Sequence, residues 1–187
     1  MSVSWNEIKK GNNNEWRILF RENAEFLYAY GMKMVHNEDL VKDTVQELFL
    51  HIYEKRSTLS KPQFIKAYLC SGLRNRLINE LKKESPESLE EGDYRFDLYI
   101  DAENSEKYEE EKQYKKIQTL LDRLTNRQRE VIYLKYFKGL SNEEIAKALD
   151  INKQSVANLI SDGLKQMKKD LLFVAFILLI LKMALRL

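Results

Sequence analysis

The chain has 187 residues, of which 44% are apolar and 32% are charged, with only six glycines and two prolines. This composition is rich in helix formers, so it favours an all-α fold and argues against collagen-like, low-complexity and β-rich architectures. A single cysteine excludes an internal disulfide and a cysteine-based zinc site, and two histidines argue against a histidine-rich metal site. We therefore expect no metal and no cofactor.

The net charge of +2 conceals an uneven distribution along the chain. Residues 1–83 carry a net charge of +4, residues 84–111 carry −10, and residues 112–187 carry +8. Two basic segments thus flank an acidic connector, and basic segments are permissive for nucleic-acid binding. The chain does not begin with a basic run followed by an apolar run, so we expect no signal peptide and a cytoplasmic protein.

Residues 8–83 show the apolar periodicity of a small helical domain. The spacing of apolar residues predicts one helix over 15–35. Asn37 is the expected N-cap of the next helix, over 38–56, since acidic residues follow it directly. A loop then leads to a third helix over 62–83. We expect these helices to form a bundle of three or four.

Residues 112–170 predict a second helical domain. It begins with a helix over 112–123, which is followed by a helix that starts at Thr125 and ends before Gly139. It ends with a short helix over 142–149, a tight turn and a longer helix over 153–169. A short helix, a turn and a longer helix form the helix-turn-helix arrangement. The residues expected to begin or end these helices are Thr125, Gly139, Ser141 with Glu144, and Asn152.

Two further segments lack this periodicity. Residues 84–111 are predicted to be a flexible acidic linker, with one apolar cluster over 94–100 that has no helical period. Residues 171–187 form an apolar C-terminal helix whose uninterrupted apolar run would be only about 16 Å long, against about 30 Å for a bilayer core. We expect this tail to pack on the protein or to dock on a partner protein; resting at a membrane surface is the alternative.

The helix predicted over 153–169 has one polar face. Gln154, Asn158, Ser161 and Lys165 lie opposite its apolar side when the residues are placed at 100° intervals. Amide and hydroxyl groups can pair with base edges in the major groove, and lysine can contact phosphate. The pattern therefore predicts DNA binding, and an ordinary helical hairpin with a solvated face remains the alternative.

Four motifs carry a resemblance to a known family. LTNRQREV at 124–131 and GLSNEEIA at 139–146 resemble region 4 of the sigma-70 family, and most closely its extracytoplasmic-function (ECF) group. This region alone is also similar to the DNA-binding domain of many response regulators. HNEDLVKDTVQELF at 36–49 resembles sigma region 2.2, and RNRLINELKK at 74–83 resembles region 2.4, so the first domain decides for a sigma factor.

The resemblance implies an alternative sigma factor, which binds core RNA polymerase, reads the −35 and −10 promoter elements with separate domains and helps to melt the DNA. It implies a protein that is not an enzyme and has no catalytic residue. It also implies an anti-sigma factor, or another regulatory protein, as a further partner. A helix-turn-helix transcription regulator that acts without being a polymerase subunit is the alternative.

At two positions, Asp162 and Gly163, the sequence departs from the Arg-Ala that the family commonly has. The carboxylate of Asp162 would repel phosphate unless it turns away or pairs with a lysine.

The matching positions give three sets of predicted site residues. The set for core polymerase, which lies on one helical stripe, is Asp43, Gln46, Glu47 and Leu50. The set for the −10 element and melting is Lys61, Arg74, Asn75, Arg76, Asn79, Lys82 and Lys83. The set for the −35 element is Lys153, Gln154, Ser155, Asn158, Ser161 and Lys165.

Overall fold

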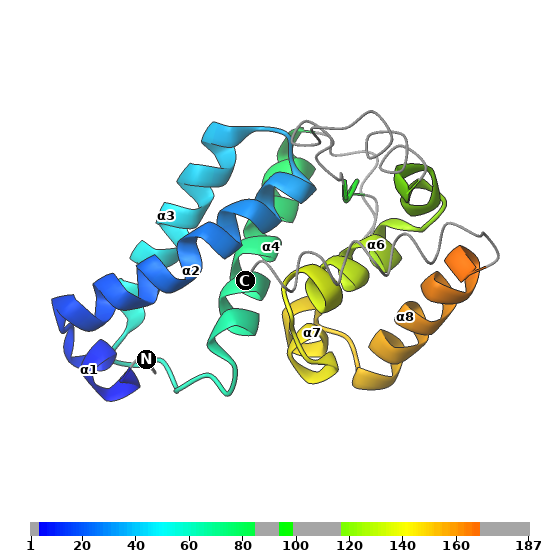
Figure 1. Cartoon of the computed structure of the whole chain (residues 1–187). Coiled ribbons are helices and arrows are strands. Elements are labelled where there is room, and N and C mark those ends of the chain that lie inside the picture. The colour runs from blue at the N-terminus through cyan, green and yellow to red at the C-terminus, as the bar shows by residue number, and fades with distance from the viewer. Residues whose placement is uncertain (1–3, 85–93, 99–116, 169–187) are drawn as a thin grey trace, which may run out of the picture. The chain divides into compact units, whose positions relative to one another are not determined.

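The computed structural model describes residues 4–84, 94–98 and 117–168, and all regular structure within these ranges is helical (Figure 1). The predicted all-α fold is thus confirmed for this part of the chain. The predictions for the tail at 171–187, and for most of the acidic linker, lie outside the described residues. No helix among the described residues is both long and apolar enough to span a bilayer.

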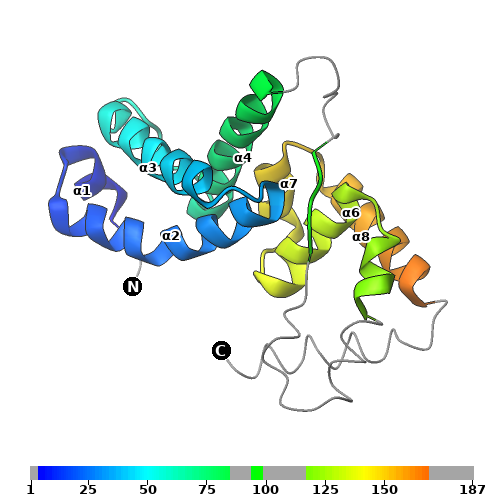
Figure 2. The same ribbon diagram turned by 90° about the horizontal axis from the view of Figure 1, so that it is seen from above.

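The chain divides into two compact units, and the division falls between Tyr94 and Arg95. The first unit contains four helices, of which α2, α3 and α4 pack against one another while α1 packs on α2 (Figures 1 and 2). Buried aliphatic side chains from these helices, such as Leu27, Ile52 and Leu77, form its core. The four helices are α1 (Trp5–Lys10), α2 (Asn13–Met34), α3 (Glu38–Lys55) and α4 (Ile65–Glu84).

Side-chain caps fix where α2 and α3 begin. Asn37 accepts a hydrogen bond from the backbone N–H of Leu40 at 3.0 Å, so it is the N-cap that the sequence predicts. Asn12 caps α2 in the same way, accepting from the N–H of Asn14 at 3.0 Å, and α2 therefore begins two residues before the predicted start. Helix α1 was not predicted, because six residues are too few to show an apolar period.

A glycine allows α2 and α3 to approach closely. A Cβ atom at Gly31 in α2 would lie 2.8 Å from Cγ1 of Val41 in α3, which is fully buried. A similar glycine, Gly72 in α4, lies against Leu48 in α3. The two glycines set the spacing of the three long helices.

We expect Gly31→Ala to lower the free energy of unfolding by about 2 kcal/mol, although alanine is the better helix former by about 1 kcal/mol. The new methyl group meets a stiff, β-branched side chain that cannot rotate away. Urea unfolding followed by circular dichroism measures the change. Combining Gly31→Ala with Val41→Ala should recover part of the loss, and strictly additive losses would contradict the steric explanation.

The second unit contains the predicted helix-turn-helix. A helix over 117–122 is followed by α6 (Asn126–Ile132), a π-helical turn η1 (Tyr133–Phe137), α7 (Asn142–Leu149) and α8 (Lys153–Lys168), and α6 packs on α8. The π-helical turn was not predicted, because the sequence has the same apolar spacing as an α-helix there.

All the predicted caps of the second unit are present. Thr125 and Gln128 form a capping box at the start of α6, and Ser141 and Glu144 form another at the start of α7. Gly139 has a φ of +69°, the left-handed conformation expected after a helix end. The side chain of Asn152 caps α8 by accepting from the N–H of Ser155 at 2.7 Å. The Asn152 cap thus fixes where α8, the helix with the polar face, begins.

Residues 95–98 differ from the prediction. The sequence places them in a flexible linker, but Phe96, Asp97 and Leu98 are buried in the structure. They form an extended segment beside α6 (Figure 2). The linker is therefore an ordered part of the second unit at this point.

Candidate functional site

The four residues predicted to bind polymerase all lie on the surface of α3. Asp43, Gln46, Glu47 and Leu50 are exposed, whereas Leu48 and Phe49 between them are buried. Leu50 is the most exposed large apolar side chain described, with 61% of its surface accessible. The stripe thus presents polar groups together with one prominent apolar group.

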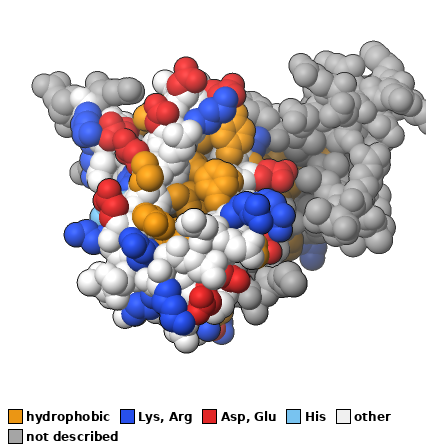
Figure 3. Space-filling view, turned by 90° about the vertical axis from the view of Figure 1, so that its left-hand side faces the viewer, with side chains coloured by type: hydrophobic (Ala, Val, Ile, Leu, Met, Phe, Trp, Pro, Cys, Tyr) orange, Lys and Arg blue, Asp and Glu red, His pale blue; other side chains and the backbone are white. Residues whose placement is uncertain are grey.

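An apolar groove between α2 and α3 lies beside this stripe. It has a volume of about 460 Å³, and its walls are largely aromatic. Phe20 of α2 is 44% exposed and meets Phe49 edge to face at 4.9 Å, and Trp16 meets Tyr53 in the same way at 5.1 Å. Figure 3 shows apolar side chains gathered on this side of the first unit, with charged side chains around them. The residues that line the groove are Trp16, Arg17, Phe20, Gln46, Phe49, Leu50 and Tyr53.

The groove continues into a second, smaller hollow of about 270 Å³ between the same two helices. Phe20 and Gln46 line both hollows, and Tyr28 and Val45 extend the apolar wall. A contiguous apolar surface with a charged rim is typical of a protein–protein contact, and an elongated groove suits a helix of the partner. The sequence stripe identified only the α3 side of this surface.

The α2 side of the groove was missed because apolar residues at helical spacing were assigned to the core. Trp16 and Phe20 lie four residues apart and share one face of α2, while Leu19 and Leu27 face the interior. The sequence did contain a signal for the α2 side of the groove: the apolar face of α2 is wider than one buried stripe requires.

The residues predicted for the −10 element lie mainly on the exposed side of α4. Arg76 is half-buried and donates from Nη1 to the carbonyl of Gly72 at 3.1 Å. Lys83 pairs with Glu80 at 2.7 Å, and this hydrogen bond raises the pKa of the lysine. The exposed members of the set are Lys61, Asn75, Asn79, Lys82 and Lys83.

Arg74 differs from the rest of its set. It is only 2% exposed, and its Nη2 atom lies 3.4 Å from the hydroxyl of Tyr94. The guanidinium carbon also lies 5.1 Å from the centre of that ring. In this structure Arg74 therefore contributes to the packing of the first unit rather than to its surface.

Of the six residues predicted for the −35 element, Gln154, Asn158, Ser161 and Lys165 lie on one side of α8, and Lys153 and Ser155 lie in its first turn. Ser155 is half-buried, and the other five are exposed. The opposite side of the helix, with Val156, Ile160 and Met167, is buried. The side-chain amide of Gln154 donates to Oδ1 of Asn158 at 2.9 Å, so the two amides are held together before any ligand arrives.

The unusual pair Asp162-Gly163 has a structural explanation. Asp162 lies 3.6 Å from Lys165, so the pairing with a lysine considered from the sequence is present. A Cβ atom at Gly163 would lie 3.1 Å from Cδ1 of Ile132, because α8 packs closely on α6 there. The glycine allows this close packing, and the lysine offsets the negative charge.

Arginines of α6 stabilise the second unit. Arg127 Nη1 lies 3.1 Å from Oε2 of Glu130, whose side chain is fully buried. Arg129 donates from Nη2 to Asn126 at 3.0 Å and lies 4.0 Å from Asp122. Both arginines thus form contacts within the second unit, which contains α8.

Two family models match the chain in order along its length. The model for sigma-70 region 2 matches residues 19–87, and the model for sigma-70, region 4 matches residues 114–167. The ECF RNA polymerase sigma factor SigX of Bacillus subtilis (strain 168) is 24% identical over 83% of this chain and 83% of its own length. The ECF RNA polymerase sigma factor SigK of Mycobacterium ulcerans (strain Agy99) is 22% identical over 88% of this chain and 90% of its own.

Two solved structures share the fold. The sigma factor RpoE, in complex with the anti-sigma factor NepR from Bartonella quintana, has a TM-score of 0.56, 18% identity and coverage of 86% of this chain and 96% of its own. CnrH, in complex with the cytosolic domain of CnrY, has a TM-score of 0.58, 18% identity and coverage of 88% and 92%.

Proposed function

This chain belongs to the sigma-70 family, in its extracytoplasmic-function group, and we propose that it is an alternative sigma factor that directs core RNA polymerase to specific promoters. The observation that carries the proposal is the order of the two matches, with region 2 followed by region 4 in one chain. Sigma factors are in general non-catalytic regulatory subunits. We accordingly propose a cytoplasmic DNA-binding subunit rather than an enzyme.

Core polymerase docks, in this proposal, on the surface formed by α2 and α3. The predicted stripe of Asp43, Gln46, Glu47 and Leu50 lies along the apolar groove, so the contact combines an aromatic centre with a polar rim. Such a combination is typical of interfaces in which a few central apolar residues supply most of the affinity.

Promoter DNA is read by two helices in this proposal. The exposed lysines and asparagines of α4 contact the −10 element and the separated strands. The polar face of α8 enters the major groove at the −35 element. There the hydrogen-bonded side-chain amides of Gln154 and Asn158 contact base edges, and Lys153 contacts phosphate.

An anti-sigma factor, or another regulatory protein, is the further partner in this proposal. In the two solved neighbours, RpoE is in complex with an anti-sigma factor and CnrH is in complex with the cytosolic domain of CnrY. A helix-turn-helix regulator that acts without polymerase is less favoured, because it gives no role to the groove on the first unit. Docking of the tail at 171–187 on a protein or a membrane surface stays a prediction.

In vitro transcription tests the proposal directly. Purified protein, bacterial core RNA polymerase without other sigma factors and a library of genomic fragments are combined, and discrete transcripts are expected only when both proteins are present. Their start sites then locate the −10 and −35 elements. DNA binding without polymerase, together with no transcripts, would favour the conventional regulator.

We expect Asn158→Ala and Lys153→Ala to weaken binding at the −35 element in different ways. Loss of the amide should cost about 1–3 kcal/mol on the cognate element and little on unrelated DNA, because a base contact is lost. Loss of the lysine should weaken binding to all sequences and flatten the salt dependence, because a phosphate contact is lost. Fluorescence anisotropy at several salt concentrations separates the two, and identical profiles would contradict this assignment.

A further inference from the structure

Asp162 extends the row of polar side chains that begins with Gln154 on α8. Residues four apart are neighbours on a helix surface, so Gln154, Asn158 and Asp162 follow one another along one row. The amide of Gln154 already donates to Oδ1 of Asn158 at 2.9 Å. The row thus presents two hydrogen-bonded amides followed by a carboxylate, which when ionised is a group that only accepts hydrogen bonds.

The packing of α8 determines the side of the helix on which Asp162 lies. The next residue, Gly163, faces α6, since a Cβ atom there would lie 3.1 Å from Cδ1 of Ile132. Successive residues lie about 100° apart around a helix, so Asp162 is turned away from this contact, and its side chain is 64% exposed. One turn further, Nε2 of Gln166 donates to the carbonyl of Arg123 at 2.8 Å. The row therefore reaches the end of the preceding helix just after Asp162.

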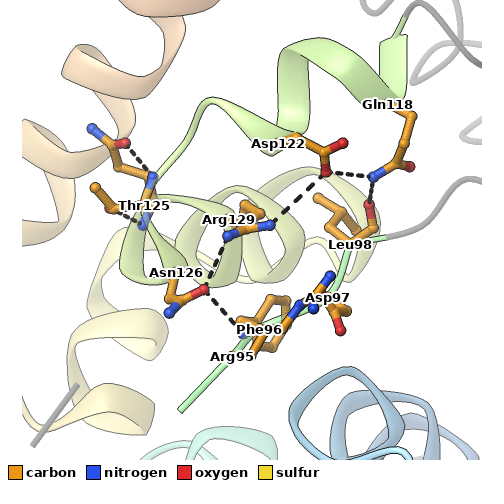
Figure 4. Close-up of polar contacts among 10 residues, drawn as sticks. Arg95, Phe96, Asp97, Leu98, Gln118, Asp122, Thr125, Asn126 and Arg129 are labelled. Atoms are coloured by element: carbon orange, nitrogen blue, oxygen red, sulfur yellow. Dashed lines mark hydrogen bonds and ion pairs between the residues drawn. The ribbon is translucent and has the colours of Figure 1, made fainter. Parts of the chain in front are cut away.

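The charge of Asp162 is offset by an exposed lysine. Nζ of Lys165 lies 3.6 Å from Oδ1 of Asp162, and the lysine side chain is 73% exposed. An exposed pair of this kind is weak, so the carboxylate stays accessible to a further donor. Arg129 of α6 is directed elsewhere, since it donates to Asn126 at 3.0 Å and lies 4.0 Å from Asp122 (Figure 4). The carboxylate therefore retains acceptor capacity for a ligand.

Hydrogen-bond chemistry restricts what an exposed carboxylate on a DNA-reading helix accepts. In the major groove, cytosine presents the amino group N4, whereas guanine presents two acceptors and thymine presents one together with a methyl group. Adenine presents its amino group beside the acceptor N7, an arrangement that suits an amide better than a carboxylate. A carboxylate is therefore favoured beside cytosine, and it is penalised beside guanine, thymine and phosphate.

We propose that Asp162 selects a cytosine in the −35 element and that Lys165 offsets the charge of the carboxylate as α8 approaches the DNA. The inference rests on the proposed function and names the base that this part of the site reads. The family commonly has arginine at this position, and the guanidinium of arginine pairs with guanine. The aspartate of this chain thus changes which base is selected, rather than only weakening a contact with phosphate.

Transcription from a promoter library tests the proposal. Core polymerase and the full-length protein are combined with a promoter recovered by the transcription assay, in which the −35 element is randomised and each template carries a transcribed barcode. The wild-type protein should prefer cytosine about tenfold or more over guanine and thymine at one position of the element. A −35 element without such a position would overturn the proposal.

Two matched substitutions separate base selection from charge. Asp162→Asn removes the charge and supplies an amide, so the preference at that position should change from cytosine to adenine. Asp150→Asn removes the same charge in the turn before α8, where φ is +51°, a conformation that asparagine tolerates. It should leave every base preference unchanged. If Asp162→Asn strengthened transcription from all templates without changing a preference, repulsion of phosphate would be the role of Asp162 and the proposal would be wrong.

Asp162→Arg provides the opposite test, because it replaces an acceptor with donors. The preference at the same position should change from cytosine to guanine by about tenfold or more. Thermal unfolding should be unchanged, since the side chain is exposed. A variant that retained the preference for cytosine would contradict base reading by this residue.

The outcomes separate the two proposals. If the wild-type protein directs transcription but the Asp162 variants keep its base preferences, base selection by Asp162 is wrong and the sigma-factor assignment stands. If the wild-type protein supports no transcription with core polymerase, the proposed function fails, and the inference about Asp162 fails with it.

Discussion

Replacing Leu50 with glutamate is expected to weaken binding to core RNA polymerase by about a hundredfold or more, without a change in stability. Leu50 is 61% exposed at the edge of the α2–α3 groove, so the fold gains little from it. An interface that buries this side chain would lose an apolar contact and gain a carboxylate that must be desolvated. Biolayer interferometry with immobilised core polymerase measures the affinity, and thermal unfolding measures the stability.

The neighbouring residue provides the matched control. His51 is also exposed on α3, but it does not line the groove. His51→Glu introduces the same charge one position away and should change polymerase affinity only slightly. If both variants lost affinity equally, long-range charge would explain the effect and the groove would not be the contact surface.

Arg127→Ala is expected to lower the free energy of unfolding of the second unit by about 3 kcal/mol. Glu130 is fully buried, and Arg127 is an ion-pair partner at 3.1 Å, so the substitution takes away a charge that offsets the buried carboxylate. Hydrogen–deuterium exchange of α6 and α8 reports the loss in this unit alone.

A double substitution distinguishes loss of the charge partner from loss of packing. Arg127→Met combined with Glu130→Met removes both charges and retains apolar volume, so it should cost less than Arg127→Ala alone. A double variant that is less stable than the single one would show that the buried charge is not the cause.

Local chemistry made much of the fold predictable. The capping residues Asn37, Thr125, Ser141 and Asn152 each accept a hydrogen bond from the backbone N–H three residues later, so a short stretch of sequence is sufficient to identify them. The polar face of α8 was predictable for the same reason, because helical periodicity alone decides which side chains share a face.

Features that depend on contacts distant in sequence were missed. The buried segment over 95–98 is held by Asn126, 30 residues after Phe96, and nothing in its acidic surroundings identifies that partner. One local signal was present, since the apolar residues 94, 96 and 98 alternate as in an extended segment. The α2 side of the groove was missed because apolar residues on one helix look alike, whether they face the core or a partner.

The positions of the tryptophans allow the fluorescence of the first unit to be followed separately from the second. Its only two tryptophans, Trp5 and Trp16, both belong to the first unit. Emission excited at 295 nm therefore follows that unit alone, whereas far-ultraviolet dichroism follows both. Trp16 also lines the groove at 5.1 Å from Tyr53, so its emission should shift when a partner covers the groove. The unlabelled protein can thus report the docking of a partner that contains no tryptophan during a titration.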